Sequence, residues 1–414
     1  MKNKIIQFIV LIFGVLILSY TGYNSIQVKN IDRINSINSD FVNQKTISPQ
    51  ALFNESWSII KNNYYKKDMN KQDWTRWKKR YKNQIKTPQD ADIAINTMLT
   101  ALNDPYSKYM NKEEFLEQNQ AFNSKLYGIG INIASISGKI YIVNVLKNAP
   151  ADNQGIQAGD IILKINDNNV AGQSIYRCAQ LIRGEKNESV DLLLLRGNEK
   201  ILKSVKRDEI KIKTVDYKKI DDDIGYIKIS SFIGLDTTKD FVIALNKLKE
   251  TKGLILDLRG NSGGLFQNAI TIADLFMKKG SIVQVIARHS KKNIYHASSK
   301  GYIYENPVVV LVDEDTASAS EILSCALQDN KRAILIGTKT FGKGLVQKVF
   351  SMPNQTGMNL TIAQYLTPNG KDINKIGIEP DYNVTIAHND FINGNDSQLI
   401  YAQNYLKRKI ENEN

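Results

Sequence analysis

The chain has 414 residues, enough for two or three domains that each have a hydrophobic core. Hydrophobic residues make up 42% and charged residues 23%, which are the proportions of an ordinary globular protein. The formal net charge is +13, but Lys and Arg are spread along the whole chain instead of clustering on one element, as they do in DNA-binding proteins. This distribution favours a basic surface that tolerates anionic lipid headgroups over a nucleic-acid partner.

The first residues have the pattern of an export signal. Lys2 and Lys4 precede an apolar run from Ile5 to Tyr20, and neither a small-residue cleavage site nor a lipobox cysteine follows. We therefore expect residues 1–23 to be an uncleaved signal anchor, with a cleaved signal peptide as the alternative. The rest of the chain would then be exported to the periplasmic side of a bacterial inner membrane, or secreted after cleavage.

A polar linker (24–47) and a helical region (48–120) are expected next. Phe53, Trp57, Ile60 and Tyr64 step by four, three and four residues, the spacing of one apolar helix stripe. Thr87 and Pro88 are typical of a helix start. The buried face of that helix is predicted to consist of Ile93, Ala94, Met98, Ala101 and Leu102.

Short strands separated by turns follow in residues 121–208 and indicate a compact β-rich module. Strands are predicted at 140–146, 161–165 and 190–195, and a helix at 175–182. Residues 209–390 then alternate between strands and helices, which predicts a mixed α/β fold with a sheet covered by helices. A C-terminal helical tail is expected at 391–414. The strands of the α/β part are predicted at 224–229, 254–258, 282–287, 308–312, 333–336, 346–350 and 360–365, and its helices at 237–250, 264–277 and 317–328.

A nucleophile is suggested where the apolar strand 308–312 runs through a polar turn into a helix. Ser318 would lie at that helix N-terminus, beyond the carboxyl end of a buried strand, where unpaired N–H groups bind a developing oxyanion. Thr316, Ser318 and Ser320 also fit ordinary helix caps, and spacing alone does not select one of them. Ser262 lies in a glycine turn (260–264) after another apolar strand, which suits an oxyanion hole better than a nucleophile.

Lysine is a better candidate base than histidine. His289 and His296 lie in a polar Lys-rich loop, His388 follows the last strand, and the sequence has no Gly-x-Ser-x-Gly elbow, so a histidine base has little support. Lys343 stands between two glycines, which would let the backbone pack closely and bury the amine, lowering its pKa. Gln347 lies four residues on and could orient the amine.

Residues 337–343 also match a phosphate-binding loop up to its lysine. However, Gly344 replaces the Ser or Thr that would hold magnesium, and a strand follows where that motif requires a helix. A glycine hairpin with an exposed lysine is the plainer alternative. The cysteines, Cys178 and Cys325, lie in different predicted domains and form neither a disulfide framework nor a zinc site.

Taken together, these motifs resemble the C-terminal processing peptidases, also called tail-specific proteases. The resemblance extends from about Phe53 to Asp381. It rests on residues 102–107 (Leu-Asn-Asp-Pro-Tyr-Ser), 127–130 (Tyr-Gly-Ile-Gly), 150–160, 181–184 (Leu-Ile-Arg-Gly), 257–264 (Asp-Leu-Arg-Gly-Asn-Ser-Gly-Gly), the Ser318 segment and 339–347.

The resemblance implies a crotonase- or Clp-protease-like core carrying an inserted PDZ domain, here residues 121–208. It assigns the nucleophile to Ser318, the base to Lys343 and the orienting amide to Gln347. Ala319 and one of Gly263 and Gly264 would supply the oxyanion donors. It implies no metal or organic cofactor.

The PDZ residues implied to bind a substrate's apolar C-terminus are Tyr127, Gly128, Ile129, Gly130 and Ile131, with Arg183 as a sensor that gates the site or, alternatively, a plain surface residue. The expected partners are exported proteins with apolar C-termini, an adaptor and, through the helical region, a second copy of the chain. The apolar stripes of that region would equally pack on its own body.

Two alternatives to a peptidase remain at this point. One is an inactive PDZ scaffold at the membrane surface, and the other is a non-peptidase of crotonase-like fold.

Overall fold

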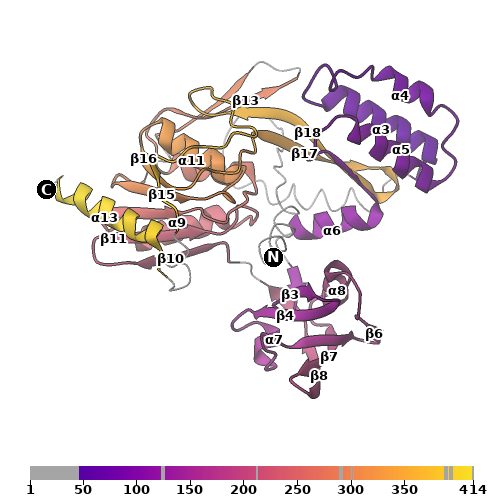
Figure 1. Cartoon of the computed structure of the whole chain (residues 1–414), viewed down its shortest axis with the longest axis horizontal. Helices are drawn as coiled ribbons and strands as arrows, with labels where there is room; N and C mark the ends of the chain where they lie inside the picture. The colour runs from indigo at the N-terminus through magenta and orange to yellow at the C-terminus, as the bar shows by residue number, and fades with distance from the viewer. Residues whose placement is uncertain are drawn as a thin grey trace. The chain divides into compact units, whose positions relative to one another are not determined.

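The computed structural model describes residues 46–122, 126–210, 213–288, 292–299, 301, 303–386, 390 and 395–412 (Figure 1). The predicted signal segment 1–23 and nearly all of the predicted linker 24–47 lie outside the described residues, as do His289 and His388. Within the part of the chain that the structure describes, no helix is both long and apolar enough to cross a membrane. The chain divides into two compact units, one formed by residues up to Glu117 together with Thr214 onward, and the other by Gln118–Lys213.

A six-stranded sheet forms the centre of the larger unit, in the order β10-β11-β12-β15-β16-β19. Strand β10 pairs antiparallel with β11, and every other neighbouring pair is parallel. The strands are β10 (Val215–Lys219), β11 (Ile224–Ile229), β12 (Gly253–Asp257), β15 (Val308–Val312), β16 (Ala333–Gly337) and β19 (Tyr382–Asn383).

Helices cover both faces of this sheet because its central strands are apolar on both sides. Leu254 and Leu256 of β12 pack against one set of helices, whereas Ile255 faces the opposite side. The first set is α9 (Thr237–Lys247), α10 (Phe266–Asp274) and α11 (Ala319–Asp329), and the opposite side is covered by α13 (Ser397–Glu411). The alternation follows from the two-residue period of a strand.

A second, five-stranded sheet belongs to the same unit. Its order is β1-β18-β13-β14, and β17 also pairs with β18. The strands are β1 (Lys108–Met110), β13 (Ser281–Ala287), β14 (Asn293–His296), β17 (Leu345–Met352) and β18 (Thr356–Leu366), and a 3-10 turn at Pro353–Gln355 joins the last two.

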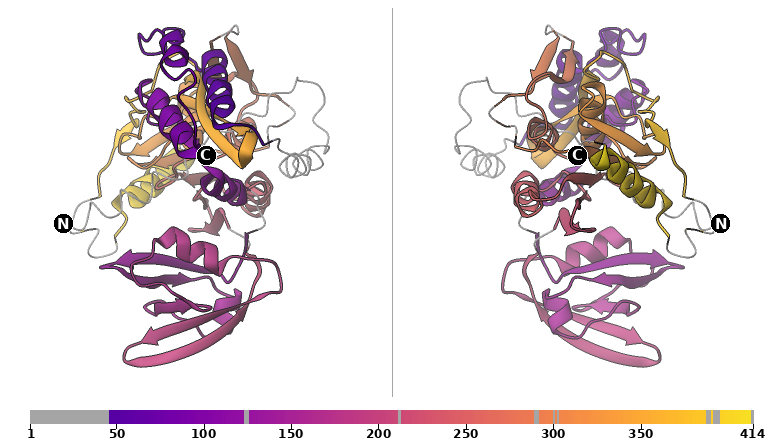
Figure 2. Two further views of the ribbon diagram at one scale, coloured as in Figure 1. Left: turned by 90° about the vertical axis from the view of Figure 1, so that its right-hand side faces the viewer. Right: turned by 90° about the vertical axis from the view of Figure 1, so that its left-hand side faces the viewer.

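The N-terminal helices pack on this second sheet, as the indigo helices beside the long orange strands show in Figures 1 and 2. They are α3 (Pro49–Asn63), α4 (Thr75–Arg80) and α5 (Pro88–Thr100), and α6 (Lys112–Phe122) follows β1. The predicted stripe of α3 is buried with Met352, Met358 and Leu360 of β17 and β18. The stripe therefore packs on the protein's own body.

Helix α5 begins as predicted, because Thr87 accepts a hydrogen bond from the N–H of Asp90 and Pro88 is the first helical residue. One predicted buried position is wrong, since Ile93 is 66% exposed. Ala91, Ile95 and Leu99 are buried instead, together with the predicted Ala94 and Met98. The buried stripe is thus rotated about the helix axis relative to the prediction.

The smaller unit is a six-stranded sheet with two short helices. Its order is β3-β4-β5-β7-β8, with β6 paired to β5, so β3 lies at an edge. Its elements are β3 (Ile131–Ile136), β4 (Lys139–Val145), α7 (Pro150–Asn153), β5 (Ile161–Ile165), β6 (Asn168–Asn169), α8 (Ile175–Ile182), β7 (Ser189–Arg196) and β8 (Glu199–Lys206), plus a separate pair formed by β2 (Leu126–Gly128) and β9 (Asp208–Ile210).

Candidate active site

Three loops meet at the carboxyl ends of three adjacent parallel strands. The loop after β12 carries Gly263 and Gly264, the loop after β15 carries Ser318, and the loop after β16 carries Lys343. Because parallel strands end at the same edge of a sheet, the fold brings these loops together. The candidate site therefore lies at one edge of the central sheet.

The backbone of Ser318 is strained. Its φ is 58° and its ψ is −116°, a conformation that a residue with a Cβ rarely adopts, directly before the first residue of α11. A sharp strand-to-helix turn of this kind presents a nucleophile above the sheet in α/β-hydrolases, where the motif is Gly-x-Ser-x-Gly. Here the same placement is reached without that motif.

The hydroxyl groups of the nearby residues have different surroundings. Ser318 Oγ is buried and has no hydrogen-bond partner among the described residues. Ser320 Oγ donates to the carbonyl of Asn261 at 2.8 Å, and Thr316 Oγ1 accepts from the N–H of Asp313 at 2.9 Å. Ser320 and Thr316 therefore hold the turn, and Ser318 alone of the three presents an unengaged hydroxyl.

Glu321 joins the loop that carries Ser318 to the loop that carries Lys343. Its Oε2 accepts the N–H of Ser318 at 2.8 Å and the N–H of Lys343 at 2.9 Å. Its Oε1 accepts the N–H of Gly342 at 2.7 Å and the hydroxyl of Thr340 at 2.6 Å. Burial raises the pKa of this carboxyl, while the four donors act in the opposite direction.

A second link between the same loops comes from β18. The hydroxyl of Tyr365 lies 3.2 Å from the carbonyl oxygen of Ser318 and also donates to the carbonyl of Lys343. Neither Glu321 nor Tyr365 was predicted from the sequence to take part in the site. The Ser-x-x-Glu spacing from Ser318 to Glu321, typical of a helix start, was the available signal for Glu321.

Lys343 is buried, with 4% of its surface exposed. Burial lowers the pKa of its amine to about 8, against the opposing effect of the negative charges of Glu321 and Asp104. Its Nζ lies over the ring of Tyr106, 4.8 Å from the ring centroid. An exposed lysine in a glycine hairpin, the plainer alternative, is therefore wrong.

Gln347 follows on β17, and its side chain is buried as well. Its Nε2 donates to Thr361 Oγ1 at 3.3 Å, and its Oε1 has no hydrogen-bond partner among the described residues. An amide oxygen and a serine oxygen are thus both buried without a hydrogen-bond donor among the described residues, and an amine is a group from which each could accept.

The two glycines after β12 lie in different surroundings. A Cβ on Gly263 would stand 2.8 Å from the Cβ of Ser318 and 2.9 Å from the N of Ala319. A Cβ on Gly264 would instead meet the backbone of Phe232 at 2.3 Å. Both have positive φ, at 102° and 144°. Only glycine fits at Gly263, because the turn packs directly against the predicted nucleophile.

Asn261 fastens this glycine turn to the Ser318 loop. Its Oδ1 accepts the N–H of Gly263 at 2.9 Å, its Nδ2 donates to Ile229, and its carbonyl accepts the N–H of Ala317 at 3.0 Å. The turn that carries the predicted oxyanion glycines is therefore held by a side chain as well as by its own backbone.

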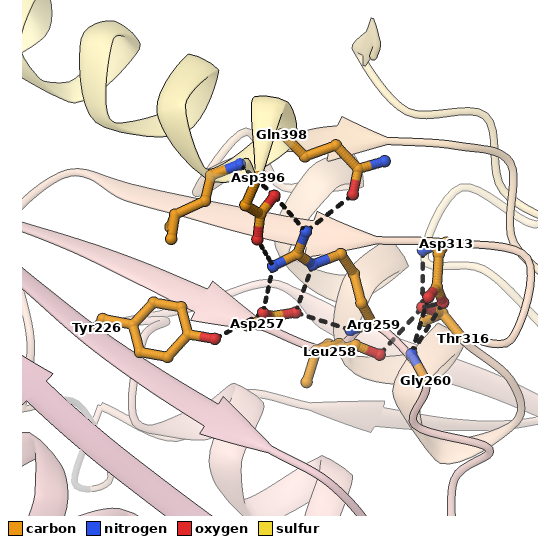
Figure 3. Close-up of polar contacts among 10 residues, drawn as sticks. Tyr226, Asp257, Leu258, Arg259, Gly260, Asp313, Thr316, Asp396 and Gln398 are labelled. Atoms are coloured by element: carbon orange, nitrogen blue, oxygen red, sulfur yellow. Dashed lines mark hydrogen bonds and ion pairs between the residues drawn. The ribbon is translucent and has the colours of Figure 1, made fainter. Parts of the chain in front are cut away.

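An ionic cluster supports the other end of the same turn (Figure 3). The guanidinium of Arg259 lies between two carboxylates, donating to Asp257 at 2.7 and 2.9 Å and to Asp396 at 2.8 Å. Tyr226 donates to Asp257 at 2.7 Å, and the N–H of Gly260 donates to Asp313. Asp396 caps helix α13 through the N–H of Leu399, so the C-terminal helix braces the turn.

The predicted tail-binding residues lie in the smaller unit. Tyr127 and Gly128 are in β2, Ile129 is buried, and Gly130, with a φ of 78°, precedes Ile131 at the start of edge strand β3. Helix α8 packs in the same core as β3. The edge of β3 is thus available within this unit for pairing with an added strand.

Arg183 is half-buried at the end of α8, where its N–H bonds to the carbonyl of Ala179. The guanidinium of Arg207, a residue not predicted to have a role, donates to the carbonyls of Ile182 and Leu181 at that helix end. A Cβ on Gly184 would stand 2.8 Å from this guanidinium, so Arg207 packs closely against the backbone there.

Three family models match the chain: the Peptidase family S41 over residues 223–384, the PDZ domain over 119–195 and the Tricorn protease C1 domain over 48–92. The carboxy-terminal processing protease CtpA of Bacillus subtilis is 37% identical over 353 residues, covering 83% of this chain and 71% of that protein.

The carboxyl-terminal-processing protease of Picosynechococcus is 35% identical over 344 residues, covering 80% of this chain and 82% of that protein. Among solved structures, the photosystem II D1 C-terminal processing protease matches with a TM-score of 0.59 and 29% identity, covering 82% of this chain and 94% of that one. These matches favour a peptidase over an inactive scaffold. The chain belongs to peptidase family S41 and is a serine-type C-terminal processing peptidase that carries a PDZ domain.

Proposed function

We propose that the protein cleaves exported proteins near their apolar C-termini through an acyl-enzyme formed on Ser318, with neutral Lys343 as the general base. The observation that carries this proposal is the strained, buried Ser318, whose Oγ is unengaged while its backbone shares the Glu321 carboxylate with Lys343. A buried lysine with a pKa of about 8 has a substantial neutral fraction near neutral pH, as a base requires.

The proposed reaction has two halves. Ser318 Oγ attacks the peptide carbonyl while Lys343 Nζ takes its proton, and the same proton is then given to the leaving amine. Water activated by the amine hydrolyses the ester. The N–H groups of Ala319 and of a glycine from the Gly263–Gly264 pair would stabilise the oxyanion, and Gln347 Oε1 would orient the amine.

A fluorophosphonate probe tests this assignment, because the probe reacts with an activated serine. We expect it to label the peptide containing Ser318 at a rate that rises with pH to a plateau, with a midpoint near 8, because only the neutral amine of Lys343 accepts the proton. Mass spectrometry of the labelled protein gives the site. Labelling should persist in Ser320→Ala and vanish in Lys343→Ala. Labelling at Ser320 or Ser262, or a rate that does not depend on Lys343, would contradict the dyad.

The PDZ domain is proposed to bind the substrate's tail. An extended peptide would add to the free edge of β3, and its carboxylate would bind the N–H groups of residues 127–131. Apolar side chains around them would select an apolar last residue, and Arg183 would sense occupancy.

Amidating the substrate's C-terminus should therefore raise KM by about tenfold or more, because the charge that those N–H groups bind is removed. The comparison uses one unfolded substrate with a free and with an amidated terminus, and follows the cleaved ends by mass spectrometry. Equal rates for both substrates would exclude capture through the carboxylate, while leaving the dyad untouched.

A further inference from the structure

The amine of Lys343 has an aromatic neighbour that the proposed mechanism does not use. Nζ lies 4.8 Å from the ring centroid of Tyr106, which belongs to the segment between α5 and β1. In the proposed mechanism the amine interacts with two oxygens, Ser318 Oγ and Gln347 Oε1. Neither oxygen makes a hydrogen bond among the described residues. The amine of Lys343 therefore lies over an aromatic ring, and neither of these oxygens is hydrogen-bonded to it.

The segment that carries Tyr106 is fixed by its own side chains. Asp104 Oδ1 accepts the N–H of Tyr106 at 3.0 Å, and its Oδ2 accepts the hydroxyl of Ser107 at 2.6 Å. These bonds and the fixed φ of Pro105 restrain the backbone of the turn. The turn holds the backbone of Tyr106, and its ring is half-buried.

The same segment is bonded to the strand that contacts Gln347. Ser107 Oγ accepts the N–H of Thr361 at 3.0 Å, and Thr361 Oγ1 accepts from Gln347 Nε2 at 3.3 Å. Strand β1 continues the attachment by pairing with β18. The loop thus contacts Lys343 directly, through the ring of Tyr106. It contacts Gln347 indirectly, through Ser107 and Thr361.

The electrostatics of this contact favour the charged amine. The face of an aromatic ring carries negative potential and attracts an ammonium group, more strongly where water is excluded. Asp104 adds a negative charge that also raises the pKa of Lys343, opposing the effect of burial. A leucine in place of Tyr106 would still cover the amine but would offer no such face.

We propose that Tyr106 is a positioning residue for the reaction, whose ring face holds the amine of Lys343 and sets its affinity for a proton. The helical N-terminal region would then supply part of the active site through residues 103–107. The proposal rests on the proposed function for its consequence in catalysis, but not for its effect on the amine itself.

The test compares Tyr106→Phe, which keeps the ring face, with Tyr106→Leu, which removes it. The proton affinity of Lys343 is measured by competitive labelling with trace acetic anhydride across pH 6–10, quantified on the peptide that contains Lys343. We expect its midpoint to fall by about 0.5 to 1 pH unit in Tyr106→Leu, because stabilisation of the charged form is lost, and to stay in place in Tyr106→Phe.

Catalysis provides the second readout. In Tyr106→Leu, kcat at its high-pH plateau should fall by about tenfold or more with KM unchanged, because the amine loses its position. The acid limb of the plot of kcat against pH should move to lower pH together with the midpoint of Lys343 labelling. Tyr106→Phe should retain most of the activity. Tyr217→Leu, at a 42%-exposed tyrosine of β10, controls for the loss of a tyrosine elsewhere.

Three results would overturn the proposal: a labelling midpoint that rises in Tyr106→Leu, a midpoint that stays fixed, or a Tyr106→Phe variant that behaves like Tyr106→Leu. If Tyr106→Leu does not fold, Tyr106→Met serves as a second apolar side chain without a ring. A shifted midpoint with no serine-dependent activity in any variant would support the role of Tyr106 while refuting the proposed function, so the two failures are distinct.

Discussion

Replacing Ser318 with alanine should reduce kcat by about 10⁴-fold or more towards an unfolded protein with an apolar C-terminus. The reason is that the oxygen that forms the acyl-enzyme is removed, and the remaining groups stabilise only the oxyanion. The measurement is the rate of appearance of new C-terminal ends by mass spectrometry.

Ser320→Ala is the matched control, because Ser320 lies two residues away in the same turn but its Oγ is engaged with Asn261. Losing that hydrogen bond should cost about 1 kcal/mol of stability and leave kcat within about tenfold of the wild-type value. Tryptophan fluorescence verifies that each variant is folded. A comparable loss of activity in both variants would contradict the assignment of Ser318 as the nucleophile, because disturbance of the turn would then explain both losses.

Replacing Lys343 with methionine should abolish cleavage and, at the same time, stabilise the protein. Burial lowers the pKa of Lys343 from 10.5 to about 8, so the folded state binds the proton less tightly than the unfolded state. The resulting cost, about 3 kcal/mol, is fully present below pH 8 and disappears as pH rises towards 10.5. Methionine is of similar length and carries no charge, so at pH 7 the variant should gain up to this amount.

Urea unfolding at pH 7 and pH 9 measures this effect. Trp57, Trp74 and Trp77, the three tryptophans of the chain, all lie in the larger unit, so their fluorescence reports on the unit that contains Lys343. The gain should be smaller at pH 9. Lys339→Met, at a lysine whose side chain is 48% exposed and paired with Glu379, should give no such gain. A Lys343→Met variant that is less stable than wild type, or equally stabilised at both pH values, would contradict the burial of a charged amine.

Much of the fold follows from periodicity in the sequence. The strands at 224–229 and 308–312 and the helix at 175–182 were predicted with the bounds that the structure gives them. The two strands are strongly apolar. The helix has a clear N-cap, Ser174, whose side chain accepts a hydrogen bond from the N–H of Arg177. Their local signals agree with their tertiary environment.

Polar edge elements were missed for the opposite reason. Strand β8 holds three Lys and one Glu among its eight residues, and only Val205 in it is fully buried, so its period-2 pattern is weak. Its partner β7 and the tight turn at Gly197, with a φ of 59°, fix it as one arm of a hairpin. The prediction that Ile93 is buried was wrong for a related reason, because the sequence alone does not distinguish an apolar residue on the exposed side of α5 from a buried one.

The candidate site was predicted only partly, because its supporting contacts join distant segments. Ser318 and Lys343 stand out by their local motifs, whereas Tyr106 reaches the amine from a segment far upstream in the chain. Glu321 was visible only as a residue of a helix start. Its contacts with the loop after β16 depend on two parallel strands ending side by side.

The hydrogen bonds of the Glu321 carboxylate determine whether the site keeps its structure when Lys343 is replaced. It binds the main chain of residues 318, 342 and 343, and none of these three bonds involves the side chain of Lys343. The lysine can therefore be exchanged while the scaffold around it keeps its shape. The Lys343→Met protein should consequently retain an intact but inactive site, suited to capturing an uncut substrate for structural study.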